Sequence, residues 1–397
     1  MSERLMRVGL IINPIAGMGG SVGLKGSDGG LAARARELGA QPEAANRVAA
    51  ALLELLRLGC PVAWYTAAGS MGEDALIAAG TPPADVTVLH QAAAPTRYQD
   101  TQHVATRMLD TRLDLLLFAG GDGTARDILA VVDDRIPILG IPAGVKMHSA
   151  VFALTPRTAG NAARRFLEAG APMRFCASGA VMDREFLANG EPASSPSLHG
   201  YLTTLKMPSL VQAAKSASGG GGDGAVLAAL PGLAAQLREF DVLLLGPGAT
   251  LKALKQELGF DGSLLGVDVF VRGRCLVRDA REDQIWALLQ ERDVGSASGH
   301  TIGLALGVIG GQGFLLGRGN QQLSARVLKA VPRENIRIVA AADKLAMLSA
   351  STLFVDTGDD AVDDELSGYL PVVTGVRRST LCRIATSGEL ERSDVAK

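Results

Sequence analysis

The chain is poor in aromatic residues and in cysteine, and it has no strong excess of charge of either sign. Aromatic residues make up 4% of its 397 residues, whereas glycine contributes 48, so small side chains must carry much of the packing. The formal net charge is −2 and the sequence contains no basic tract. This balance argues against binding to nucleic acid or to an anionic membrane. The length is sufficient for two or three domains.

The cysteines are few and widely separated, and none forms a CxxC pair: Cys60, Cys176, Cys275 and Cys382. This pattern argues against a disulfide framework and against a zinc site, and it fits a reducing compartment. The apolar run near the N-terminus is too short for a signal peptide, and no apolar run is long enough to span a bilayer. We therefore expect a cytoplasmic protein that forms homo-oligomers and has neither nucleic acid nor a membrane as a partner.

Apolar strand-like runs alternate with helical patterns along the first part of the chain, beginning with "RVGLIIN" at residues 7–13. This alternation predicts an α/β fold with a Rossmann-like, mostly parallel sheet in an N-terminal domain over residues 1–150. Ser/Gly-rich stretches then predict a connecting region over residues 151–240. The pattern restarts in a second α/β domain over residues 241–385, with a cleft between the domains and a polar tail over 386–397.

The most informative stretch is "FAGGDGTARDI" at residues 118–128, which directly follows an apolar run. Gly120, Gly121, Gly123 and Thr124 would surround phosphate groups, because glycine lets backbone N–H groups approach an anion at a helix N-terminus. Asp122 would bind Mg²⁺ or accept a proton from a substrate hydroxyl. The alternative is a tight turn in which Asp122 only caps the helix.

A second glycine-rich loop, "NPIAGMGG" at residues 13–20, follows the first predicted strand. Asn13 can hydrogen-bond across a turn, and Gly17, Gly19 and Gly20 can form another phosphate-facing surface. The loop lacks the Lys–Ser/Thr ending of a P-loop and is not a GxGxxG motif. Two such loops after parallel strands in one domain predict a phosphate site better than either loop alone.

Several other residues could bind phosphate, ribose or Mg²⁺, but each of them could instead have a purely structural role. Lys146 could neutralise phosphate and His148 could orient a ribose hydroxyl, or both are ordinary surface and capping residues. Asp127 could help Asp122 to hold Mg²⁺, or it lies on the helix surface. The turn at Gly246, Gly248 and Thr250 could hold another phosphate, although Thr250 could simply cap a helix.

The last candidates are two polar residues of "GRGNQQ", Arg318 and Asn320. Arg318 could clamp a phosphate and Asn320 could bind a base or ribose, or the loop is hydrogen-bonded scaffolding. The histidines His90, His103, His199 and His300 share no spacing, and we interpret them as structural or surface residues.

The glycine loops resemble a known superfamily. "NPxAGxGG" after the first strand, with "GGDGT" about 100 residues later, is similar to NAD kinases and diacylglycerol/sphingosine kinases. Longer segments resemble ATP–NAD kinase family proteins of the AcoX-like branch: "GLKGSDGG", "GIPAGVKMHSAVFA", "LLLGPGATLKAL", "GGQGFLLGRGNQQLS" and "FVDTGD". The resemblance implies Mg²⁺-dependent transfer of a phosphoryl group from ATP or polyphosphate to the 2′-hydroxyl of NAD, giving NADP. It also implies that Asp122 lies beside the transferred phosphoryl group.

The sequence also departs from typical NAD kinases. It lacks the Asn-Glu pair after GGDGT and the "TPTGSTAY"-like segment that bind NAD in those enzymes, and its second half has an α/β pattern instead of a β-rich one. Three alternatives therefore stay open: a kinase of another small or lipid hydroxyl compound, a nucleotide-binding sensor without turnover, and isomerase-like chemistry at "LGPGAT".

Overall fold

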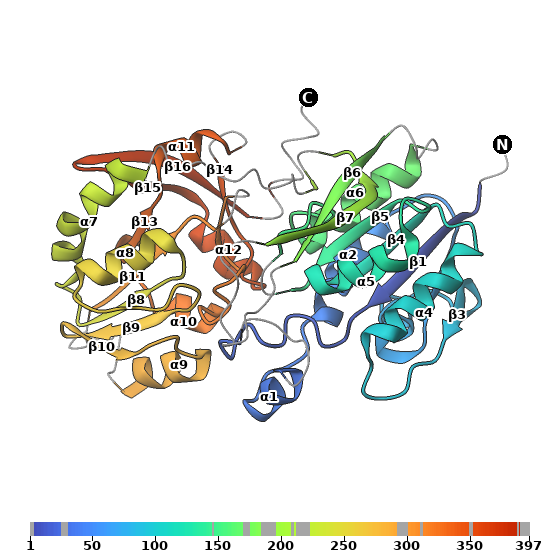
Figure 1. Ribbon diagram of the computed structural model, residues 1–397, viewed down its shortest axis with the longest axis horizontal. Helices are drawn as coiled ribbons and strands as arrows, with labels where there is room; N and C mark the ends of the chain where they lie inside the picture. The colour runs from blue at the N-terminus through green and yellow to red at the C-terminus, as the bar shows by residue number, and fades with distance from the viewer. Residues whose placement is uncertain are drawn as a thin grey trace.

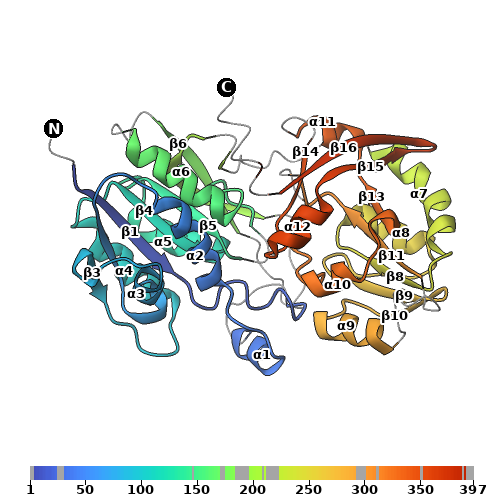
Figure 2. The ribbon, with the colours of Figure 1, turned by 180° about the vertical axis from the view of Figure 1, so that it is seen from behind.

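The computed structural model describes residues 4–24, 31–144, 147–169, 175–183, 196–207, 210–211, 223–291, 301–309, 313–348, 352–386 and 389. Two α/β domains lie side by side, each built on its own mixed, mostly parallel sheet (Figures 1 and 2). The predicted fold class is thus confirmed. None of the helices in these ranges is long and apolar enough to cross a membrane.

The first domain holds a seven-stranded sheet in the order β3-β2-β1-β4-β5-β7-β6. Strands β1 to β5 pair in parallel, and β6 runs antiparallel to β7. The strands are β1 (Met6–Ile12), β2 (Val62–Ala67), β3 (Val86–His90), β4 (Leu115–Gly120), β5 (Ile138–Pro142), β6 (Cys176–Asp183) and β7 (Ser197–Leu205). The helices are α1 (Leu31–Glu37), α2 (Ala44–Leu55), α3 (Glu73–Ala78), α4 (Tyr98–Leu109), α5 (Asp122–Val132) and α6 (Pro156–Glu168), with 3₁₀ turns at Gly69–Met71 and Pro83–Asp85.

Helices cover both faces of the first sheet, which explains why β4 is apolar and buried along its whole length. On one face, alternate residues of β1 such as Val8 and Leu10 pack with α2 and α6. On the other face, Ile11 packs with α4 and α5. The central strands therefore end between two helical layers, and the loops that follow them emerge at one edge of the sheet.

The second domain holds a nine-stranded sheet in the order β10-β9-β8-β11-β13-β15-β16-β14-β12. The strands are β8 (Val242–Leu245), β9 (Asp268–Val271), β10 (Arg274–Val277), β11 (Ile302–Gly307), β12 (Phe314–Leu316), β13 (Ile336–Val339), β14 (Thr352–Val355), β15 (Gly368–Gly375) and β16 (Arg378–Thr386). The helices are α7 (Asp223–Leu237), α8 (Ala249–Glu257), α9 (Glu282–Glu291), α10 (Ala325–Lys329), α11 (Ala342–Ala346) and α12 (Asp360–Leu366), with a 3₁₀ turn at Arg333–Asn335. Strands β8, β11, β13 and β15 are parallel neighbours.

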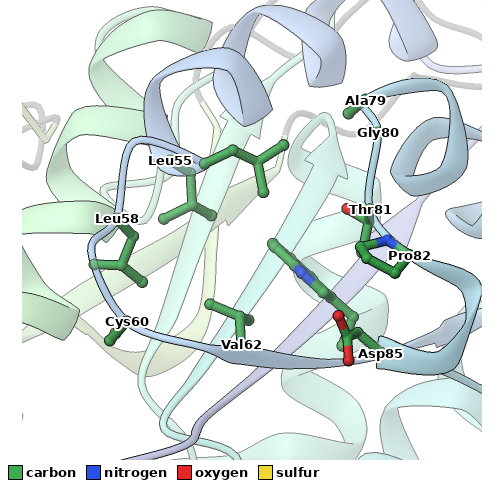
Figure 3. A pocket seen from close by; sticks show the side chains of 11 residues that line it. Leu55, Leu58, Cys60, Val62, Ala79, Gly80, Thr81, Pro82 and Asp85 are labelled. Atoms are coloured by element: carbon green, nitrogen blue, oxygen red, sulfur yellow. The ribbon is translucent and has the colours of Figure 1, made fainter. Parts of the chain in front are cut away.

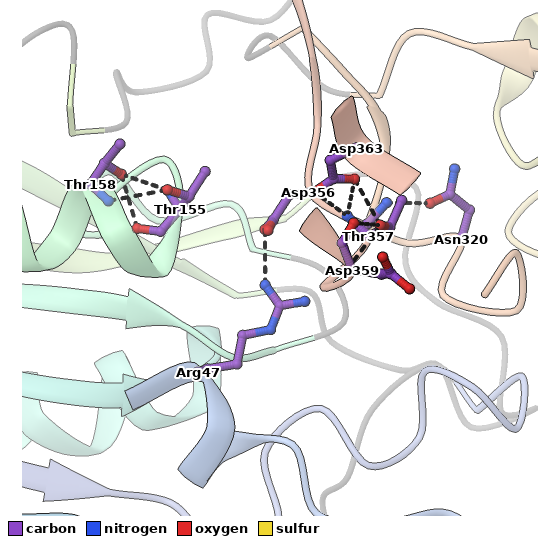
Figure 4. Close-up of polar contacts among 9 residues, drawn as sticks. Arg47, Thr155, Thr158, Asn320, Asp356, Thr357, Asp359 and Asp363 are labelled. Carbon is purple, nitrogen blue, oxygen red and sulfur yellow. Dashed lines mark hydrogen bonds and ion pairs between the residues drawn. The ribbon is translucent and has the colours of Figure 1, made fainter. Parts of the chain in front are cut away.

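The segment expected to connect the domains, residues 151–240, instead contributes to both. Helix α6 and strands β6 and β7 extend the first sheet, where the Thr204 hydroxyl donates to the Ile138 carbonyl at 2.8 Å. Helix α7 packs on the second domain beside α8. A local contact marks the start of α6, where the Thr155 hydroxyl caps the helix by accepting from the Thr158 N–H at 3.1 Å (Figure 4).

Ion pairs and an apolar cluster join the two domains. Arg47 of α2 contacts Asp356, which follows β14, at 2.9 Å (Figure 4), and Arg157 of α6 contacts Asp360 of α12 at 2.7 Å. Leu154 packs with Phe314 and Phe354. The cleft that we expect between the domains stays a prediction.

Gly160→Ala tests the packing of α6 on α2. A Cβ at Gly160 would lie 2.0 Å from the Ala51 carbonyl oxygen, so the helices must separate. We expect the free energy of unfolding to fall by about 1–3 kcal/mol, the usual cost of overpacking. Chemical denaturation would measure this change.

Gly232→Ala is the matched control, because Gly232 lies in α7 and a Cβ there would have no neighbour within 4 Å. Alanine should be neutral there or stabilising by up to about 1 kcal/mol, as its helix propensity exceeds that of glycine. Equal effects of the two substitutions would contradict the proposed close packing.

Candidate active site

Three segments of the first domain meet at the carboxyl ends of its parallel strands: residues 13–20 after β1, residues 120–124 where β4 leads into α5, and the described residues 142–144 and 147–149 after β5. The Asn13 side chain donates from Nδ2 to the Thr124 hydroxyl at 3.1 Å. The Gly120 carbonyl accepts from the N–H groups of Ala143 and Gly144 at 3.1 and 3.0 Å. The structure thus brings together the two glycine-rich loops that the sequence pointed to.

Two close approaches explain why these loops need glycine. Gly17 has a φ of +79°, and a Cβ there would lie 2.2 Å from the Ala143 carbonyl oxygen. A Cβ at Gly144 would lie 2.8 Å from the Gly121 Cα. The glycines therefore let three backbone segments pack against one another, a role that sequence reasoning did not assign to them.

Asp122 begins α5 and joins the second of these loops to the third. Its side chain is buried, and Oδ2 accepts from the His148 N–H at 2.7 Å. Oδ1 accepts from the N–H and the hydroxyl of Ser149, at 2.9 and 2.6 Å. Asp122 is not the N-cap of the helix, since Gly121 occupies that position. The carboxylate instead fastens the loop at 148–149 to the start of α5.

Burial raises the pKa of Asp122 to about 6, and the charge of Asp183 contributes in the same direction. The hydrogen bonds from Ser149 and His148 oppose this rise. A carboxylate has about four acceptor positions, so three donors leave one position on Oδ2 for a further partner. A pKa near neutrality and a remaining acceptor position suit a general base.

The first turn of α5 supplies N–H groups beside this carboxylate. The N–H groups of Asp122, Gly123 and Thr124 lie where an α-helix has no acceptor of its own for them. The positive end of the helix dipole lies at the same place, which favours an anion. A phosphate group fits the chemistry of this helix start.

Helix geometry argues against Asp122 and Asp127 as a metal pair, and the predicted metal role of Asp127 stays a prediction. Five positions on an α-helix correspond to a rotation of about 140°, so the two side chains leave α5 in different directions. The carboxylate that sequence reasoning missed is Asp183 at the end of β6, whose charge acts on Asp122 and which pairs with Arg126 at 2.7 Å. Mg²⁺ commonly takes one or two carboxylates together with water and substrate phosphates, so Asp183 is a further candidate ligand for it.

The residues of the third loop were only partly anticipated. His148 contributes its backbone N–H to Asp122, and the predicted Lys146 lies outside the described residues. Sequence reasoning missed Ser149, whose hydroxyl donates to Asp122 and accepts from the Met182 N–H at 3.0 Å. No local pattern marks Ser149, because its importance depends on its distance from a residue 27 positions earlier.

In the second domain, backbone hydrogen bonds to β11 and to the segment before β9 hold the predicted "GPGAT" turn. The Gly246 N–H donates to the Ala305 carbonyl at 3.0 Å, and the Gly248 N–H donates to the Leu264 carbonyl at 2.8 Å. Thr250 lies in the first turn of α8. A phosphate site at this turn stays a prediction.

The "GRGNQQ" loop faces the first domain at Gly20, where a Cβ would lie 3.0 Å from the Gln321 side chain. Asn320 is buried and serves as scaffolding, since Oδ1 accepts from Gly317 N–H at 3.1 Å and Nδ2 donates to the Leu315 carbonyl at 2.7 Å. Arg318 lies over the Phe314 ring at 4.2 Å. Burial lowers the pKa of Arg318 to about 10, while the charge of Asp356 opposes that shift.

A separate hollow of about 330 Å³ lies at the amino end of strand β2, away from the carboxyl ends that carry the glycine loops (Figure 3). Its lining comes from the end of α2, the start of β2 and the segment after α3: Leu55, Leu56, Leu58, Cys60, Val62, Trp64, Ala79, Gly80, Thr81, Pro82 and Asp85. The glycine loops follow the opposite ends of the strands, so this hollow is not part of the candidate site.

Gly17→Ala tests whether the contact between the first and third loops stabilises the site. Alanine at Gly17 would have to adopt a left-handed backbone conformation, and its Cβ would also collide with Ala143. Gly39 has a similar φ of +85°, but a Cβ there would have no neighbour within 4 Å. We expect Gly39→Ala to cost about 1–2 kcal/mol of unfolding free energy, the backbone term alone. Gly17→Ala should cost about 1–3 kcal/mol more, as measured by urea denaturation. Equal costs would contradict the contact.

Comparison with known proteins gives the family. No curated protein matches the chain. Solved structures of proteins assigned as diacylglycerol kinases from Bacillus anthracis str. Sterne are similar at 17% identity and a TM-score of 0.22, and the match covers 48% of this chain and 47–48% of theirs. The chain thus spans about half the length of those structures.

The profile of the ATP-NAD kinase N-terminal domain matches residues 8–171, and that of the C-terminal domain matches residues 241–384. The second half therefore matches the family although it lacks the motifs typical of NAD kinases, and the chain belongs to the ATP-NAD kinase family.

Proposed function

We propose that the chain is a kinase that transfers a phosphoryl group from ATP or polyphosphate to the 2′-hydroxyl of NAD, giving NADP. Family membership supports a phosphotransferase. The observation that carries the proposal is Asp122, a buried carboxylate with a pKa of about 6 beside the N-terminus of α5. A proton acceptor and an anion site are adjacent there, as phosphoryl transfer requires.

In the proposed reaction, Asp122 accepts the proton of the acceptor hydroxyl through the remaining position on Oδ2. The hydroxyl oxygen then bonds to the terminal phosphorus of the donor, while the bond from that phosphorus to the bridging oxygen of the leaving phosphate breaks. The N–H groups at the start of α5 stabilise negative charge on the transferred group. When Asp122 acts as the base, its last acceptor position is occupied, so Mg²⁺ would be held by Asp183 and the donor phosphates and would supply further positive charge.

The choice of acceptor is the finer part of the proposal. The missing Asn-Glu pair and "TPTGSTAY"-like segment favour a second candidate, in which another small hydroxyl compound replaces NAD. A non-catalytic nucleotide sensor is the alternative outside the kinases. We assign the reaction to the cytoplasm, because the separated cysteines fit a reducing compartment. Homo-oligomer formation stays a prediction.

Asp122→Asn should reduce turnover by at least about a thousandfold, because general-base catalysis contributes 10²–10⁴-fold and charge at the site is also lost. A coupled assay for NADP with NAD, Mg²⁺ and either ATP or polyphosphate would measure this loss. Nucleotide binding, followed by calorimetry, should be largely retained. Asp134→Asn, which removes an exposed carboxylate of the same domain, is the control and should keep activity.

The unfolding temperature of both variants separates loss of chemistry from loss of fold, since Asp122 also holds the loop at 148–149. Near wild-type turnover in a folded Asp122→Asn variant would refute the mechanism. Absence of NADP formation by the wild type, with clear ATP binding, would direct the search to another acceptor or to the sensor.

The pH dependence follows from the raised pKa of Asp122. The base must be ionised, so kcat/KM should fall as the pH drops through about 6. Ser149→Ala removes a hydrogen bond that favours the ionised carboxylate, so this acid limb should move up by about one unit. An acid limb that does not move in Ser149→Ala would indicate that another group controls it.

A further inference from the structure

Two histidines and an aspartate that sequence reasoning left unconnected converge beside the edge of the first sheet. His90 ends β3, and Asp100 and His103 lie on α4. The His90 Nε2 lies 2.9 Å from Asp100 Oδ1, and the His90 and His103 ring centres are 5.7 Å apart. One potential ligand atom from each of the three side chains lies within 4.8 Å of the other two.

The fold positions each of these side chains by a backbone interaction. The His90 carbonyl accepts from the Ala68 N–H at 2.8 Å, which holds the end of β3 in the sheet. Asp100 accepts the Arg97 N–H on Oδ2 at 2.8 Å as part of a helix cap, so that its Oδ1 is directed to His90. His103 follows Asp100 by three positions and therefore lies on the same side of α4.

We propose that His90, Asp100 and His103 form a binding site for Zn²⁺. Imidazole nitrogen and carboxylate oxygen are ligands that Zn²⁺ prefers, and three protein ligands leave a fourth position for water. The His90 and Asp100 side chains are 18% and 17% exposed and His103 is exposed, so an ion can enter from solvent. The separated cysteines had argued against a zinc site, but this ligand set uses none of them.

The site is separate from the candidate active site and does not rest on the proposed function. Strand β3 is the edge strand and lies three positions from β4 in the sheet, or roughly 14 Å at the usual strand spacing. Two imidazoles also suit a transition-metal ion rather than the Mg²⁺ that phosphoryl transfer uses.

Bound Zn²⁺ would link the half-exposed edge strand to the first two turns of α4. Strand β3 has no fully buried residue, and metal ligation across to α4 would hold it against the domain. An ion that binds only the folded site stabilises the folded state by mass action. Zn²⁺ should therefore raise the unfolding temperature of the metal-free protein.

The test uses full-length protein treated with a chelator, which is then removed. Co²⁺ added to the metal-free protein should give the intense visible absorption of a four-coordinate site. About one equivalent of Zn²⁺ should then displace Co²⁺ and abolish that absorption. Calorimetry should show that His103→Ala weakens Zn²⁺ binding at this site by at least about tenfold. Because His103 is exposed, this variant should fold normally. Millimolar Mg²⁺ should not displace Co²⁺.

His199→Ala is the matched control, since it removes an exposed histidine on β7 in the same domain. It should keep the affinity for Zn²⁺ and the rise in unfolding temperature. The proposal is overturned if the protein gives no such absorption, or if His103→Ala binds Zn²⁺ as tightly as the wild type. Equal weakening by His199→Ala would also overturn it, because binding would then not depend on this triad.

Discussion

The buried carboxylate of Asp122 is the interaction on which the arrangement of the candidate site depends. It accepts two backbone N–H groups and one hydroxyl from residues 148–149 while it belongs to the first turn of α5. Three opposing hydrogen bonds compensate part of the cost of burying this charge, and the rest is visible as a pKa of about 6. The same side chain therefore determines the shape of the site and its proton affinity.

Close backbone packing surrounds this carboxylate. The loops after β1, β4 and β5 touch through main-chain atoms, and a Cβ at Gly17 or Gly144 would collide with a neighbouring loop. Glycine thus lets one loop approach another, and we propose that the same lack of side chains lets an anion approach the loops. Loops held by such contacts would suit the proposed phosphoryl transfer, since catalysis of that reaction consists of positioning and electrostatic stabilisation.

The second domain meets the first through charged side chains as well as through the apolar cluster of Leu154, Phe314 and Phe354. Arg47 pairs with Asp356, and Arg318 lies buried near the same aspartate. Asp363 holds Thr357 by accepting from its N–H and hydroxyl at 3.0 and 2.7 Å, which shapes the "FVDTGD" segment (Figure 4). Asp363 thus fixes the backbone directly after Asp356, the residue that pairs with Arg47 of the first domain.

The sequence alone determined the α/β class and the strands that precede the glycine loops, and it singled out Asp122 as a candidate, because these depend on periodicity and on local turn chemistry. Tertiary structure decided what depends on distance between remote residues. It joined α6, β6 and β7 to the first sheet, placed Ser149 and Asp183 around Asp122, and used Asn320 as scaffolding. It also brought His90 to Asp100 and His103, since only the packing of α4 on β3 makes neighbours of residues that share no sequence pattern.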